Sequence, residues 1–324
     1  MYDVVAAGEL LIDFAPGGTT PEGTVLFERN PGGAPGNVLA ILAKLGKKTA
    51  LISKVGKDPF GEYLISVLRK IGIETKGILT TGEANTTLAF VHLDSRGDRS
   101  FSFYRKPGAD MLLAKREIDP ELAGNTRIFH FGSVSMTHEP SRSATLHAVK
   151  TARESGAAIS YDPNLRPPLW DSMAEAKSVI VKGLDYADIL KVSEEELEFI
   201  TGIADPEKGS GTIREKYGIQ LILVTMGAKG CFYRLGDFTG RQSAYDVKTI
   251  DTTGAGDAFT GAFLYRLIES GKAPAELDKA EMEQMVDFAS AAGSLATVKK
   301  GAIPAMPSLA EIEECMRNTA KLCG

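Results

Sequence analysis

The feature that most constrains the fold of this 324-residue chain is a regular alternation of short apolar strands and amphipathic helices. Parallel strands need a crossover, which a helix usually supplies, so repeated strand–helix units predict a mostly parallel sheet with helices on both faces. Ligands bind such α/β sheets at the carboxyl ends of the strands. The predicted strands include 4–12, 49–55, 128–131, 157–161, 189–192 and 221–224, and the predicted helices include 59–71, 139–155, 173–184, 194–201, 279–299 and 308–318.

Two β-rich segments interrupt this alternation. Thr86–Leu93 and Arg99–Arg105 are joined by the turn residues 94–98, which include a glycine, and this pattern is typical of a β-hairpin. Further upstream, the first strand is expected to end at Asp13 and to be followed by a loop over 16–24 and a short strand over 25–29. We therefore predict one domain, 1–324, with a small β-sheet lid formed from about 14–30 and 85–106.

The bulk composition excludes several classes of protein. A net charge of −5 disfavours binding to nucleic acid or to an anionic membrane. No apolar run approaches the length of a membrane span, and the N-terminus lacks the basic cluster of a signal peptide. The three cysteines and four histidines show no metal-binding spacing. We expect a cytoplasmic protein.

Residues 251–262, DTTGAGDAFTGA, contain the strongest chemical signal in the chain. Gly254, Ala255 and Gly256 allow backbone N–H groups to approach a ligand at the start of a helix, where anions are stabilised. Asp257 would repel an anion there, and a role that suits it is to accept a proton from a hydroxyl that attacks a bound phosphate. The alternative is an ordinary glycine-rich loop in which the aspartate caps the helix.

Several polar segments follow predicted strands and suggest a site for a polyhydroxylated ligand. Asp13 follows the first strand, and Asn37 lies in the glycine-rich segment GGAPGN at 32–37. Asn164 and Arg166 follow another strand and could contact sugar or phosphate oxygens, whereas Arg105 on the hairpin could close over a substrate. Each of these segments could also be a structural loop, a turn or a solvated lid strand.

Two further segments are candidates for the cofactor site. In KVSEEE at 191–196, Lys191 is a candidate cofactor-binding residue, and Glu196 could organise water on Mg²⁺, although acidic residues also complement helix dipoles. The segment TMGAKG at 225–230 allows close backbone approach to nucleotide phosphates, as a hairpin turn also would. The chain lacks a Walker pattern, a dinucleotide-binding fingerprint and a protein-kinase signature.

Together, these segments resemble the ribokinase-like (PfkB-type) carbohydrate kinases over nearly the whole chain, and within that family they are most similar to fructokinases. The similarity rests above all on the 251–257 motif, with GGAPGN at 32–37, 161–170 and KGAIPA at 300–305. Ser193 departs from the family pattern, in which many members have Asn, and so does Ser290, where plant-type fructokinases commonly have Asn. The resemblance implies a ribokinase-like fold with a β lid.

The resemblance also implies roles for individual residues. Asp257 would be the base, with Gly254, Ala255 and Gly256 as the anion hole. Asp13, Gly33, Asn37, Arg105 and Arg166 would hold the sugar. Thr225, Gly227 and Gly230 would hold ATP, with Ser290 and Gly293 beside the adenine. Asp251 and Thr253, with backbone at Ala296, Lys299 and Gly301, would bind K⁺ or another monovalent cation.

The expected activity is therefore transfer of the ATP γ-phosphate to the 6-hydroxyl of D-fructose, with Mg²⁺. Another sugar kinase, acting on 2-keto-3-deoxygluconate, ribose or a nucleoside, is the nearest alternative. A noncatalytic sugar sensor should lack the base or the anion hole, and this chain has both. A redox enzyme is disfavoured because its dinucleotide fingerprint is missing. A homodimer formed through the lid is also expected, because an exposed hairpin edge invites pairing.

Overall fold

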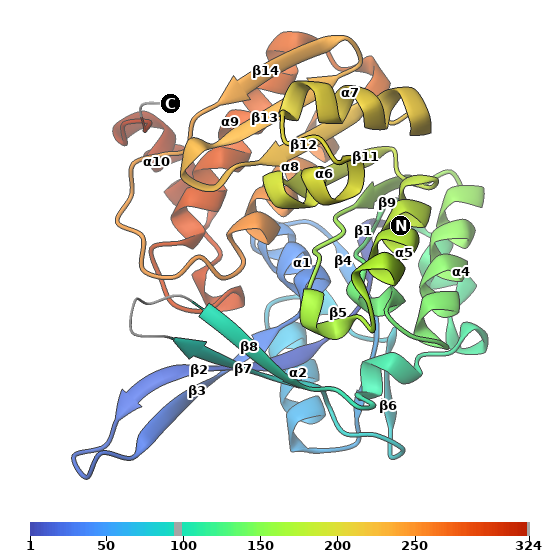
Figure 1. Ribbon diagram of the computed structural model, residues 1–324, viewed down its shortest axis with the longest axis vertical. Coiled ribbons are helices and arrows are strands. Elements are labelled where there is room, and N and C mark those ends of the chain that lie inside the picture. Colours follow the sequence, from blue (N-terminus) through green and yellow to red (C-terminus); the bar gives the residue numbers. More distant parts are fainter. Residues whose placement is uncertain (94–98, 323–324) are drawn as a thin grey trace.

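The computed structural model describes residues 1–93 and 99–322, so the predicted hairpin turn at 94–98 lies outside the described residues. Within this part of the chain, a large sheet has the strand order β14-β13-β12-β11-β10-β9-β1-β4-β5, with β6 paired to β4 (Figure 1). Its strands are β1 Tyr2–Ala7, β4 Thr49–Gly56, β5 Ile73–Glu74, β6 Ile78–Thr81, β9 Thr126–Phe131, β10 Ala158–Tyr161, β11 Ile189–Ser193, β12 Leu221–Thr225, β13 Cys231–Leu235 and β14 Phe238–Gln242.

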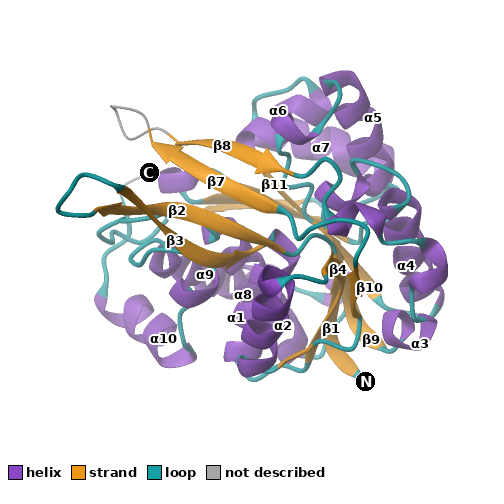
Figure 2. Cartoon of the chain, turned by 90° about the horizontal axis from the view of Figure 1, so that it is seen from below, coloured by secondary structure: helices purple, strands orange, loops and turns teal. Residues whose placement is uncertain are grey.

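The large sheet is parallel from β5 to β12, and β13 and β14 extend it as an antiparallel hairpin. Helices cover both faces, as the alternation predicts (Figures 1 and 2). The helices are α1 Ala34–Lys44, α2 Pro59–Lys70, α3 Pro120–Gly124, α4 Ser141–Glu154, α5 Met173–Leu184, α6 Glu194–Thr201, α7 Pro206–Tyr217, α8 Ala255–Ser270, α9 Lys279–Ala296 and α10 Leu309–Asn318. The sequence pattern did not predict helices α3 and α7.

Strand β1 shows why the fold needs two apolar layers. Val4 and Ala6 belong to one core with α1, α8 and α9, whereas Val5 and Ala7 belong to a second core with α4, α5 and α6. Successive side chains of a strand point to opposite faces, so a strand buried on both faces has a continuous apolar sequence. This explains the apolar run at the start of the chain.

A second sheet has the order β3-β2-β7-β8, from strands β2 Leu11–Thr19, β3 Val25–Gly32, β7 Leu88–Leu93 and β8 Arg99–Tyr104 (Figure 2). The prediction of one strand over 4–12 was wrong, because β1 ends at Ala7 and β2 belongs to this other sheet. Gly8 lies at the break, where a Cβ atom would stand 2.5 Å from the Pro35 ring. The loop predicted over 16–24 is also shorter, because β2 continues to Thr19.

No helix in the described part of the chain is long and apolar enough to cross a membrane.

Candidate active site

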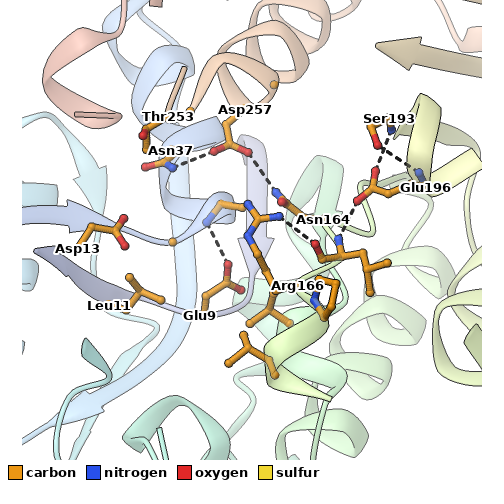
Figure 3. A pocket seen from close by; sticks show the side chains of 18 of the residues that line it. Glu9, Leu11, Asp13, Asn37, Asn164, Arg166, Ser193, Glu196, Thr253 and Asp257 are labelled. Carbon is orange, nitrogen blue, oxygen red and sulfur yellow. Dashed lines mark hydrogen bonds between the residues drawn. The ribbon is translucent and has the colours of Figure 1, made fainter. Parts of the chain in front are cut away.

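A cavity of about 580 Å³ lies where the small sheet meets the carboxyl ends of the large-sheet strands (Figure 3). Residues from β2, β11, the start of α1, the loop after β10 and the start of α8 line it. The cavity brings together half of the sequence-predicted site residues: Asp13, Gly33, Asn37, Asn164, Arg166, Lys191, Glu196, Thr253, Gly254, Gly256 and Asp257.

Asp257 lies in the first turn of α8 and is buried, with 7% of its surface exposed. Its Oδ2 accepts a hydrogen bond from Asn37 Nδ2 at 2.8 Å, and its Oδ1 accepts one from Asn164 Nδ2 at 3.3 Å (Figure 3). Burial raises the pKa of the Asp257 carboxyl, whereas the Asn37 hydrogen bond and the charge of Lys191 act in the opposite direction. The carboxylate is therefore fixed in orientation and has an increased affinity for a proton.

The backbone before Asp257 turns sharply into the start of α8. Gly254 is the N-cap of α8 at a φ of 75°, in the left-handed region that favours glycine, and it provides no side-chain cap. A helix leaves its first N–H groups without intrahelical partners, and its dipole adds positive potential there. At Gly256, a Cβ atom would stand 3.1 Å from Lys191 Nζ, so the ammonium group lies beside this turn.

Lys191 is held in place by a carboxylate that the sequence analysis did not single out. Its Nζ lies 3.1 Å from Asp162 Oδ2, and both side chains are buried. Burial opposes the charge of Lys191, yet the carboxylates of Asp162, Glu196 and Asp257 raise its pKa. For Asp162, burial raises the pKa to about 7. The lysine is thus a fixed cation at the floor of the cavity.

Two carboxyl groups from the N-terminal segment also face the cavity. Burial raises the pKa of Asp13 to about 7, against the lowering effect of Arg166. Burial likewise raises the pKa of Glu9 to about 7. Glu9 was not predicted as a site residue, although an acidic residue directly after the apolar run of β1 is a signal that could have identified it.

Asn164 lies in the loop after β10, and Glu196 lies in the first turn of α6, which begins directly after β11. Glu196 accepts hydrogen bonds from the backbone N–H groups of Leu165, at 2.7 Å, and Ser193, at 2.8 Å, so it joins the loop after β10 to the start of α6. Asn164 has a φ of 51°, an uncommon conformation for a residue other than glycine. Arg166 lines the cavity, and its Nη1 donates to the carbonyl of Leu165 at 3.1 Å.

Arg105 is the sequence-predicted sugar-binding residue that the structure does not bring to this cavity. Its guanidinium is buried and forms an ion pair with Asp110 at 2.7 Å. It also donates to Thr137 Oγ1 at 2.8 Å and to the carbonyl of Val134 at 3.1 Å. These partners occupy the guanidinium, which faces a neighbouring depression lined by His138 and other residues.

A second cavity, of about 390 Å³, lies on the other side of the start of α8. Among the residues that line it are the predicted nucleotide-binding residues Thr225, Gly227, Gly230, Ser290 and Gly293, together with Ala255. Thr252 and Gly256 line both cavities, so the two cavities meet at the first turn of α8. Gly230 allows the close approach of strands here, because a Cβ atom would stand 1.9 Å from the carbonyl oxygen of Gln242.

The predicted cation-binding residues gather around Asp251, which is buried. Its Oδ1 accepts a hydrogen bond from Thr253 N at 2.8 Å, and its Oδ2 accepts one from Gly301 N at 3.0 Å. Ala296 ends α9, next to Thr297, whose carbonyl accepts from Asp251 N at 3.0 Å. Lys299 turns its ammonium outward to Glu311, so only its backbone could serve an ion here. Backbone and hydroxyl oxygens beside one buried carboxylate fit a hard monovalent cation.

These features define the class: an α/β scaffold in which two cavities meet at a glycine-rich helix start, in a chain that has no Walker pattern. The model of the pfkB family of carbohydrate kinases matches residues 1–309. The chain belongs to this family, and it is a fructokinase-type sugar kinase.

Similar proteins and structures support this placement. Fructokinase-1 from rice, Oryza sativa subsp. japonica, is 45% identical over 97% of this chain and 98% of its own length. A fructokinase from Xylella fastidiosa with bound ATP is 34% identical, with a TM-score of 0.90 and coverage of 98% of this chain and 99% of the other.

Two further structures carry ligands of interest. A double mutant of the Vibrio cholerae O395 fructokinase, with bound fructose, ADP and potassium ion, is 33% identical, with a TM-score of 0.87 and coverage of 97% and 98%. A putative ribokinase II from E. coli, in complex with ATP and Mg²⁺, is 27% identical, with a TM-score of 0.87 and coverage of 98% and 99%.

Proposed function

We propose that the protein transfers the γ-phosphate of ATP to the 6-hydroxyl of D-fructose, giving fructose 6-phosphate and ADP. The observation that carries this proposal is the position of Asp257. It is a buried carboxylate with a raised pKa, fixed by two amides, in the same helical turn at which the two cavities meet. A sugar hydroxyl in one cavity and a phosphate chain in the other would react at that turn.

In this mechanism, Asp257 accepts the proton of the attacking hydroxyl while the oxygen forms its bond to phosphorus and the bond from phosphorus to the ADP oxygen breaks. The backbone at Gly254, Ala255 and Gly256 stabilises the negative charge on the transferring group, together with the dipole of α8 and the ammonium of Lys191. Asn37 and Asn164 keep the carboxylate aimed at the substrate. Holding both reactants in line supplies a large part of the rate acceleration.

The sugar would lie between the small sheet and the loop after β10. Asp13, Gly33, Asn37, Asn164 and Arg166 line this cavity and offer donors and acceptors for hydroxyl groups. ATP would lie in the second cavity, with its phosphates beside Thr225, Gly227 and Gly230 and its adenine beside Ser290 and Gly293. Arg105 would join the sugar site only if it left its partner Asp110.

Two metal ions complete the proposal. Glu196 would hold Mg²⁺ through water, since its carboxylate lines the cavity beside Lys191. K⁺ or another monovalent cation would be held at Asp251 and Thr253 with backbone at Ala296, Lys299 and Gly301, and it would add positive potential behind the anion hole. When bound, Mg²⁺ would neutralise charge on the phosphate chain.

We also propose that the chain forms one domain, 1–324, and that its small sheet serves as a lid over the larger cavity. The protein would act in the cytoplasm as a homodimer in which two small sheets pair. In support, Val25, Leu26, Phe27 and Tyr104 are exposed on this sheet. Phe27 and Tyr104 each make edge contacts with Phe90, so they form one aromatic group.

An ADP-release assay across D-fructose, ribose, 2-keto-3-deoxygluconate and adenosine tests the substrate. We expect the highest kcat/KM for fructose, and regiochemistry follows from whether phosphoglucose isomerase accepts the product. A higher kcat/KM for another substrate would show that a different sugar kinase activity applies. No turnover of any of the four, with both sugar and ATP still bound, would favour a sugar sensor.

A further inference from the structure

The segment that follows α10 lies against one wall of the second cavity. Residues 319–322 run alongside residues 244–246, a stretch between β14 and α8. Leu322 N donates a hydrogen bond to the Ala244 carbonyl at 2.8 Å. A second backbone hydrogen bond of 2.8 Å joins the two stretches in the opposite direction, as in an antiparallel pair of strands. The segment after α10 is therefore docked on the cavity wall by its backbone.

A carboxylate on α9 holds this docked segment in place. Helix α10 packs on α9, and the Lys321 ammonium lies 2.9 Å from Asp287 Oδ1 (Figure 1). The same oxygen accepts hydrogen bonds from the Tyr245 hydroxyl and from Gln242 Nε2, both at 2.9 Å. Asp287 thus joins three separate stretches of the chain to α9. It lies three residues, or nearly one helical turn, before Ser290, which lines the same cavity.

Leu322 makes this segment a part of the cavity wall. Its side chain is half-buried and lines the cavity. Other lining residues come from the stretch before α8 and from α9, and they include Ala244, Tyr245, Val247, Ser290 and Ser294. A leucine side chain has no group that can bind a phosphate oxygen, whereas the base and ribose of a nucleotide offer apolar surface that it can cover. Leu322 therefore suits the nucleoside part of a nucleotide.

Given the proposed function, we propose that residues 319–322 form part of the nucleotide site. Leu322 packs on the adenosine part of ATP and raises the affinity for the nucleotide. Lys321 is a positioning residue, because its ion pair with Asp287 keeps Leu322 in the cavity wall. None of the described residues 319–322 lines the larger cavity, so the segment should not affect sugar binding or the transfer step.

Two variants test the two roles. Leu322→Ala removes most of the proposed contact with adenosine. Lys321→Glu places a second negative charge beside the Asp287 carboxylate, and the repulsion should release the segment. Titration calorimetry on the full chain would measure the binding of ATP and of inorganic tripolyphosphate, which has the phosphates but no nucleoside. Steady-state kinetics and thermal unfolding would be recorded for each variant.

Each variant has a matched control outside the cavity. Leu309→Ala removes a partly exposed leucine at the start of α10 that does not line the cavity. Lys279→Glu reverses a lysine that also pairs with a carboxylate on α9, that of Glu283 at 3.7 Å, away from the cavity. Both controls should bind ATP as the wild type does.

We expect Leu322→Ala to raise the Kd for ATP about fivefold, slightly more than the loss of one buried methylene group would. The Kd for tripolyphosphate, kcat and the KM for fructose should stay within about twofold of the wild type. Lys321→Glu should weaken ATP binding by a similar factor. The double variant should bind ATP no more weakly than Lys321→Glu alone, because a released segment no longer presents Leu322.

An unchanged Kd for ATP in Leu322→Ala would overturn the proposal. Equal losses for ATP and tripolyphosphate would also overturn it, because they would locate the effect in the phosphate site or in the fold. Additive losses in the double variant would refute the positioning role of Lys321. The proposed function can fail separately, since ATP binding is measured without sugar: a wild type that binds ATP but does not phosphorylate fructose would refute the sugar assignment alone. A wild type that does not bind ATP would refute both.

Discussion

The substitution Asp257→Asn isolates the proposed proton transfer, because it keeps the shape of the side chain and removes its basicity. General acid–base catalysis contributes typically 10² to 10⁴ in rate, or about 3–5 kcal/mol of activation free energy. We expect kcat to fall by that factor. The affinity for ATP should change little, because the residues proposed to bind the nucleotide line the other cavity.

The effect on folding can be worked from the contacts of Asp257. The amide oxygen of Asn can keep the hydrogen bond from Asn37, whereas its NH₂ group would face that of Asn164, so about one hydrogen bond, worth about 1 kcal/mol, is lost. The loss is offset because a buried charge disappears, and burial is what raises the pKa of Asp257. The free energy of unfolding should therefore stay within about 1 kcal/mol of the wild type.

The assay is ADP release at saturating fructose and ATP, with ATP affinity from titration calorimetry and stability from urea unfolding. Asp278→Asn is the control, since Asp278 caps α9 outside the cavity and should leave kcat unchanged. A kcat within a few-fold of wild type would refute the role of Asp257 as base. A loss of turnover matched by loss of ATP binding or of stability would instead indicate a structural role.

Three further predictions concern pH, the sugar cavity and the small sheet. The pKa of Glu9 rises from 4.5 to about 7 on folding, so its contribution to stability is full below pH 4.5 and is lost as the pH rises through 7. Between pH 4 and 8, the free energy of unfolding of Glu9→Gln, measured by urea unfolding, should therefore fall by about 3 kcal/mol less than that of the wild type. Parallel curves of unfolding free energy against pH would contradict this. Gly33→Ala should abolish sugar binding or destabilise the fold, because φ is 115° and a Cβ atom would stand 2.4 Å from the carbonyl oxygen of Glu9; normal calorimetric binding of fructose would argue against it. Phe27→Ser combined with Tyr104→Ser should convert a dimer to a monomer in sedimentation experiments, and an unchanged mass would exclude the small sheet as the interface.

The sequence predicts the parts of this site that depend on local pattern. The α/β alternation predicts the large sheet, and the glycine-rich start of α8 places Asp257 in a first helical turn. The segment around Asn164 and Arg166 follows a strand, as its pattern indicates. Residues at the carboxyl ends of parallel strands necessarily meet at one edge, so their convergence on a single cavity follows from the fold class.

Other features depend on contacts between distant segments. Arg105 reads as a free lid residue in the sequence, but Asp110, Thr137 and the Val134 carbonyl engage its guanidinium. The role of Asp162 depends on the adjacency of β10 and β11, which sets it against Lys191. The break at Gly8 is hidden in the sequence because the chain is apolar on both sides of it, in one sheet and then in the other.

The arrangement would resolve the conflict between the proposed anion hole and the carboxylate beside it. A fully ionised Asp257 would repel the phosphate, yet a fully protonated one could not accept a proton. Burial favours the protonated form, whereas Asn37, Lys191, Arg166 and Asn164 favour the ionised one, and the net effect is a raised pKa. The Asp162 carboxylate forms an ion pair with the Lys191 ammonium, so this positive charge is fixed in position beside Gly256. The same opposition acts on Asp13, where burial and Arg166 have opposite effects on the pKa. Asp13 and Asp257 therefore share one feature: burial raises the pKa of each carboxyl group, and a neighbouring positive charge acts against that effect.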